Sequence, residues 1–225
     1  MRLTLPKLSL GMFYLAASTA AFANSTVFLS LDGNFSTPDY AFYSYIDTSN
    51  VQSESIPVGP YITYLNGNGF DNTLAYTFCY DFYSPTNVGT SYPGVLEVQT
   101  DTATLEATYL VHELDTLGLM NAPLATRGAI SLAIWEIMNP TSTTGQTPFP
   151  SDPAAQPYEL AAANAVLGGS WTTADSARYP TWVPNDPSIQ RFGMVIMDPA
   201  PEPASLALMG LGMIGLGILR RRRKS

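Results

Sequence analysis

The hydrophobic period of this chain changes near residue 101. From Leu74 to Tyr83 every second residue falls on one aromatic face, which is the period of a β-strand. After Asp101 the apolar residues recur at helical spacing, and Phe192 to Met197 again reads as a strand. The order is therefore strands, then helices, then a strand, with no βαβ alternation and no internal repeat. This order predicts one α+β domain. We expect an antiparallel β-sandwich or barrel-like sheet with a small helical subdomain inserted between Asp101 and about Gly168.

The strand from Leu74 to Tyr83 is the clearest in the sequence. Its aromatic face is expected to form the core side of the sheet. The residues of this face are Leu74, Tyr76, Phe78, Tyr80 and Phe82. Val95 to Val98 is expected to pair with this strand after a turn at Pro93-Gly94, and two more strands are predicted at 26–31 and 61–65.

Three helices are predicted in the second half. Asp101 is placed to cap the first helix, over residues 102–117, which Gly118 would end. Asn121 is a candidate cap for the second helix, which must stop at Asn139-Pro140. A third, Ala-rich helix is predicted from residue 158 to 167.

The folded body is strongly acidic. All 18 acidic residues lie between Asn24 and Pro203, where the basic residues are only Arg127, Arg178 and Arg191, so this segment carries a net charge of −15. Such a surface repels phosphate backbones, which excludes nucleic acid as a partner. The body also contains no Lys, which excludes Schiff-base chemistry, a phosphate-binding Walker lysine and Lys–Asn isopeptide crosslinks.

Both ends of the chain carry targeting features. Residues 1–23 combine a basic start, an apolar stretch and the small-x-small pattern Ala21-Phe22-Ala23, which predicts a secretory signal peptide and a mature chain that begins near Asn24. A retained membrane anchor is the alternative. We therefore expect residues 24–200 to form the extracellular domain.

The C-terminal segment, 201–225, begins with Pro201, Glu202 and Pro203. The uncharged run 204–219 is a predicted single transmembrane helix: it would rise about 24 Å, against a hydrocarbon core of ~30 Å. The basic tail 220–224 follows and would stay on the cytoplasmic side of the inner membrane.

This tail closely resembles the PEP-CTERM sorting signal. The resemblance implies processing near Pro201-Glu202-Pro203 by an exosortase, a membrane cysteine-dependent transpeptidase-like enzyme. It also implies delivery to the cell surface or extracellular matrix of a Gram-negative bacterium, with exopolysaccharide as a candidate partner. A tail anchor that is never cut is the alternative.

A second resemblance concerns two separated segments. The first segment is Phe78-Cys79-Tyr80-Asp81 on a predicted strand, and the second is Ala129 to Glu136 on a predicted helix. Together they are similar to the bacterial thioester domain pattern. The resemblance implies that the strand and the helix are neighbours, with Cys79 near Ser131 and with Asp81 and Trp135 as supporting motif residues. In that family pattern, Cys and Gln side chains form an internal thioester that attaches covalently to amines.

The helix departs from this pattern at the Gln position, where the chain has Ser131. An alcohol has no carboxamide for a thiolate to attack, and the other Gln residues, Gln190 among them, lie in different segments. We therefore expect no thioester, and Cys79 as a buried free thiol without a disulfide partner.

Other chemistry is weakly supported by the sequence. His112 and Asp115 supply too few ligands for a metal site and are expected on a solvated helix face, while Ser131, His112 and Asp81 lack the setting of a catalytic triad. No metal or other cofactor is expected. The sequence thus favours a surface or matrix protein, structural or adhesive, without catalytic activity. The alternative is a secreted carbohydrate-active enzyme that uses paired carboxylates.

Overall fold

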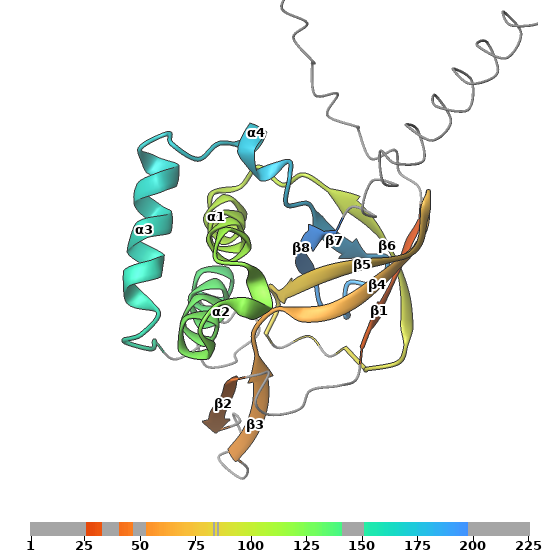
Figure 1. The fold of residues 1–225 in the computed structure, drawn as a ribbon, viewed down its shortest axis with the longest axis horizontal. Helices are drawn as coiled ribbons and strands as arrows, with labels where there is room; N and C mark the ends of the chain where they lie inside the picture. The colour runs from red at the N-terminus through yellow and green to blue at the C-terminus, as the bar shows by residue number, and fades with distance from the viewer. Residues whose placement is uncertain are drawn as a thin grey trace, which may run out of the picture.

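The computed structural model describes residues 26–32, 41–46, 53–82, 84, 86–140 and 151–197. Within them, six antiparallel strands close into a barrel in the order β1-β4-β5-β8-β7-β6, and helices pack beside it (Figure 1). The barrel strands are β1 (Val27–Leu31), β4 (Tyr61–Gly67), β5 (Phe70–Cys79), β6 (Ser91–Glu97), β7 (Thr181–Pro184) and β8 (Phe192–Ile196). This confirms the α+β class and the barrel-like sheet.

Strands from opposite ends of the chain are neighbours in this barrel. β8 pairs with β5, with Cys79 opposite Phe192, and β6 pairs with β1 and β7. The predicted pairing of Val95 to Val98 with the Leu74 strand is therefore wrong. The edge of β5 that this pairing required is taken by β8, which returns to the sheet after the helices.

The face of β5 that points into the barrel is the opposite of the one that the sequence predicts. Residues paired across neighbouring antiparallel strands point to the same side, and Leu31 pairs with Thr63, which pairs with Ala75. The fully buried inward residues include Val27, Leu29, Thr63, Leu65, Ala75, Thr77, Trp182, Phe192 and Met194. The smaller β5 residues face inward because the bulk of Trp182 and Phe192 already fills the lumen.

The aromatic face of β5 lies on the outer side of the barrel. Phe78 and Tyr80 are buried there, whereas Leu74 and Tyr76 are only half-buried. The prediction that this face is the core side thus holds only for the end of the strand near the helices, where α2 contacts β5.

The helices form the expected subdomain, which begins after Asp101 but extends beyond Gly168. They are α1 (Thr102–Thr116), the short η1 (Leu119–Asn121), α2 (Leu124–Met138), α3 (Gln156–Leu167) and α4 (Thr173–Ser176). Asp101 caps α1 by accepting a hydrogen bond of 2.9 Å from the Thr104 amide, and Gly118 ends it with φ +83°. Asn121 is not the cap of α2, because it lies in η1 and Pro123 takes the capping position.

Five elements were not predicted: the hairpin of β2 (Ala41–Ile46) and β3 (Ser53–Val58), the strand β7 and the short helices η1 and α4. The predicted signal peptide 1–23 and the C-terminal segment 201–225, with its transmembrane prediction, lie outside the described residues. Within the described ranges, no helix has the length and apolarity needed to cross a membrane.

Candidate functional site

Cys79 is the last residue of β5, at the end of the barrel near α2. It is 9% exposed, and it lines one pocket with Tyr61 and Gln190, whose side chains lie near the thiol. Burial strongly raises the pKa of this thiol, because the thiolate would lose its hydration. Cys79 is a free thiol in the structure, and burial favours its protonated form.

Gln190 lies on the segment that enters β8, and its side chain is 7% exposed. Its carboxamide nitrogen donates a 2.9 Å hydrogen bond to the Asp81 carbonyl, and its Oε1 accepts one of 3.3 Å from the Thr86 hydroxyl. The carboxamide is thereby held in the pocket that Cys79 also lines. The sequence interpretation set Gln190 aside because it lies in a different segment, but β5–β8 pairing brings that segment beside Cys79.

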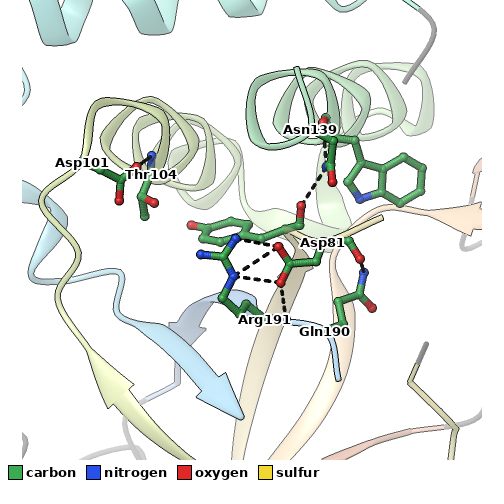
Figure 2. A network of polar contacts seen from close by, with 8 residues as sticks. Asp81, Asp101, Thr104, Asn139, Gln190 and Arg191 are labelled. Atoms are coloured by element: carbon green, nitrogen blue, oxygen red, sulfur yellow. Dashed lines mark hydrogen bonds and ion pairs between the residues drawn. The ribbon is translucent and has the colours of Figure 1, made fainter. Parts of the chain in front are cut away.

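An ion pair between Asp81 and Arg191 holds this arrangement (Figure 2). The Arg191 Nη2 lies 2.6 Å from Asp81 Oδ1, its Nε lies 2.8 Å from Oδ2, and its backbone amide donates to Oδ2 at 2.9 Å. The Arg191 carbonyl in turn accepts a 3.0 Å bond from the Tyr80 amide. These contacts join Tyr80 and Asp81, which follow Cys79, to Arg191, which follows Gln190.

Helix α2 contributes Ser131 and Trp135 to the same region. Ser131 and Cys79 line one small space that is too narrow to hold a water molecule, together with Tyr61, Phe78 and Trp135. The Ser131 hydroxyl is buried and has no hydrogen-bond partner among the described residues. The structure thus brings Cys79 and Ser131 to one cavity, and it adds Gln190, which the sequence interpretation had placed elsewhere.

A pocket of about 250 Å³ leads to Cys79 from outside. Its lining is mainly apolar: Leu31, Pro57, Tyr61, Phe82, Val88 and Trp135, with Thr86 and Gln190 as the polar members. Phe82 and Trp135 meet edge to face with ring centroids 4.9 Å apart. The thiol–carboxamide contact is therefore reached through an aromatic, poorly hydrated approach.

The other sequence candidates lie apart from this site. His112 stacks on Trp171, with centroids 4.9 Å apart, and its Nδ1 lies 2.9 Å from the Tyr179 hydroxyl. It is half-buried against an aromatic cluster, so the expectation of a solvated helix face was wrong. Since Asp81 is bound to Arg191, the residues Ser131, His112 and Asp81 do not form a triad.

Two carboxylates that the sequence did not single out do meet. Glu159 on α3 lies near Glu136 on α2, and burial together with this neighbouring carboxyl group raises the pKa of Glu159 to about 7. Across the described part of the chain, no cluster of three or more His, Cys, Asp or Glu side chains forms a candidate metal site.

Comparison with known proteins adds two similarities. Among solved structures, the chain is similar to the N-terminal thioester domain of a surface protein from Clostridium perfringens, with a TM-score of 0.41 and 9% sequence identity over 76% of this chain and 99% of that chain. None of the curated proteins matches the chain. Residues 199–224 match the PEP-CTERM protein-sorting motif, which implies an exported protein that an exosortase processes at the cell surface.

Proposed function

We propose that this exported surface protein attaches covalently to a partner through an internal thioester between Cys79 and Gln190. One observation carries the proposal: Cys79 and Gln190 are both buried and line the same pocket, which places the Gln190 side chain beside the thiol. A thiol and a carboxamide held together are the two reactants that this bond requires. The proposal replaces our sequence-based expectation of no thioester, which assumed that Gln190 was distant.

The bond forms without an outside reagent. The Cys79 sulfur adds to the carboxamide carbon of Gln190, the C–N bond breaks, and the thiol proton leaves with the amide nitrogen as ammonia. A partner amine then attacks the thioester carbon, which yields an amide to Gln190 and returns the thiol of Cys79. Each molecule reacts once, so the protein is an attachment device without catalytic turnover.

The surrounding residues have defined roles in this chemistry. Asp81 and Arg191 fix the two reacting segments, which converts the encounter of thiol and carboxamide into a preorganised contact. The unpartnered Ser131 hydroxyl in the adjoining cavity is the donor for the oxygen that becomes negative as sulfur adds. Burial and the apolar approach protect the thioester from hydrolysis.

The sorting signal supplies the setting for this attachment. A protein delivered to the outside of the cell meets matrix components and other surfaces, so a single covalent bond would hold it in place. We propose an adhesive or structural role in the extracellular matrix, with amine-bearing exopolysaccharide as a candidate partner.

Intact-mass measurement of the protein extracted from the cell surface tests the proposal. The thioester form lacks ammonia and is about 17 Da lighter than the sequence mass, since one amide nitrogen leaves as sulfur adds. Cys79→Ala and Gln190→Glu should each abolish the deficit, whereas Gln156→Glu, an exposed position on α3, should keep it. Methylamine should remove the deficit in the natural protein and leave a methylamide on Gln190. A natural protein at full sequence mass, before any amine is added, would overturn the proposal.

A further inference from the structure

A second cleft lies in the helical subdomain and shares no residue with the pocket over Cys79. It has a volume of about 350 Å³, within the range of ~300–1,000 Å³ typical of small-molecule sites. Its walls come from α1 and from the segment between α3 and the end of α4, which lie side by side in Figure 1. The lining residues are Tyr109, His112, Glu113, Ser170, Trp171, Asp175, Arg178 and Tyr179.

Four rings form one wall of this cleft. Trp171 stacks on His112 at 4.9 Å, meets Tyr109 edge to face at 5.7 Å, and lies 6.0 Å from Tyr179. The Trp171 indole is itself fixed by a 3.1 Å hydrogen bond to the Thr108 hydroxyl. The wall is therefore rigid before any ligand arrives, which lowers the entropy lost on binding.

The hydrogen-bonding state of His112 is set by its neighbours. The Tyr179 hydroxyl donates its proton to Asp115 at 3.0 Å, so the Tyr179 oxygen can only accept from His112 Nδ1 at 2.9 Å. In the neutral ring this leaves Nε2 as an acceptor. The cleft thus presents an oriented acceptor for a hydroxyl group, on a ring whose tautomer is fixed.

The charged residues of the lining are of both signs. Glu113 and Asp175 are acidic and Arg178 is basic, and Asp175 is partly engaged through hydrogen bonds from Thr172. This balance, in a body with net charge −15, gives no attraction for an anion. The mixture of planar polar groups with aromatic rings instead suits a neutral ring that carries hydroxyl groups along its edge and C–H groups on its face.

We propose that this cleft is a binding site for a neutral saccharide of one or two rings. The apolar face of the sugar packs against Tyr109 and the neighbouring rings. Its hydroxyl groups hydrogen-bond to Glu113, Arg178 and His112. The site is independent of the Cys79–Gln190 bond, so the protein has a reversible glycan contact in addition to its covalent attachment.

Titration of the exported protein with cellobiose, maltose and N,N′-diacetylchitobiose tests the site, with digalacturonate as the anionic comparison. The readout is the NMR signal of the Trp171 indole N–H, and the Trp182 indole inside the barrel is the internal control. We expect at least one neutral disaccharide to shift the Trp171 signal while the Trp182 signal stays in place. Arg178→Ala and Glu113→Gln should each weaken binding about tenfold, since each removes charge-assisted hydrogen bonds.

Two control variants show whether binding is confined to this cleft. Glu97→Gln changes an exposed carboxylate on β6 and should leave the affinity unchanged, and Cys79→Ala should do the same because the thioester is not involved. The proposal is overturned if no neutral disaccharide shifts the Trp171 signal at about 20 mM, well beyond ordinary weak sugar affinity. It is equally overturned if digalacturonate binds more tightly, or if affinity survives both cleft variants or is lost with Cys79.

Discussion

The barrel and the helical subdomain are built by different kinds of contact. The subdomain, from Asp101 to Tyr179, is continuous in sequence and its helices start and stop at local signals such as the Asp101 cap. The barrel closes only when β1 meets β6 and β5 meets β8, the latter across more than a hundred residues. The two regions therefore differ in how far apart in the chain their deciding residues lie.

The candidate sites follow the same division. The aromatic cleft uses residues of the helical subdomain alone, and the Cys79–Gln190 contact exists only because the barrel is closed. A change that opens the barrel should remove the Cys79–Gln190 contact without directly altering the aromatic cleft. Four variants test how separable the two regions are, and they are ordered by expected effect.

Gly94→Ala should affect the barrel most. A Cβ at residue 94 would lie 2.5 Å from the Trp182 ring and 2.5 Å from the Val183 carbonyl, inside a filled lumen. Overpacking of this kind should lower the free energy of unfolding by about 3 kcal/mol or more, measured by urea denaturation. Adding Trp182→Phe should recover part of the loss, and a Gly94→Ala protein as stable as the natural one would contradict this packing.

Asp81→Asn tests the ion pair with Arg191, which joins the segment after β5 to the segment before β8. It removes the charge that binds Arg191 but keeps the shape of the side chain, and we expect a loss of about 2 kcal/mol because the pair is only half-buried. The 17 Da deficit, if the thioester forms, should also decrease, since the carboxamide is less firmly placed. Asp71→Asn, an exposed aspartate on β5, is the control and should change neither quantity.

Asp101→Ala tests the local signal that begins the subdomain. The variant loses the hydrogen bond to the Thr104 amide, which should cost about 1 kcal/mol in urea denaturation. Hydrogen exchange should show faster opening in the first turn of α1 and little change in the barrel amides. Thr100→Ala serves as the neighbouring control, and equal destabilisation by both variants would argue against the capping role.

Glu159→Gln tests the contact between α3 and α2, with the smallest effect. In the folded protein the pKa of Glu159 is raised to about 7, so the protonated form is favoured by folding. Its stabilising contribution is fully present below the unfolded pKa of about 4.5 and is lost as pH rises through about 7. Melting temperatures at pH 5 and pH 8 should differ less in the variant than in the natural protein. Glu97→Gln should keep the full pH dependence, since that carboxylate is exposed.

The accuracy of the sequence interpretation falls as contacts become less local. The three longer helices and their order were predicted, because caps and terminating glycines act within a few residues. The barrel-like sheet was predicted as a class, but the partner of the Val95 strand was wrong, and the inward face of β5 was reversed. Alternation shows that a strand has two different faces, yet it does not show that Trp182 fills the lumen and displaces the aromatic face outward.

The sequence by itself determined the sorting signal at residues 199–224, the acidic body and the change from strands to helices, since each is written in consecutive residues. It also determined that Cys79 has no disulfide partner within the chain, because the chain contains one cysteine. Only the tertiary structure decided which Gln meets that cysteine. The antiparallel pairing of β5 with β8, fixed by the Asp81–Arg191 ion pair, places Gln190 against Cys79, and no spacing along the chain encodes that register.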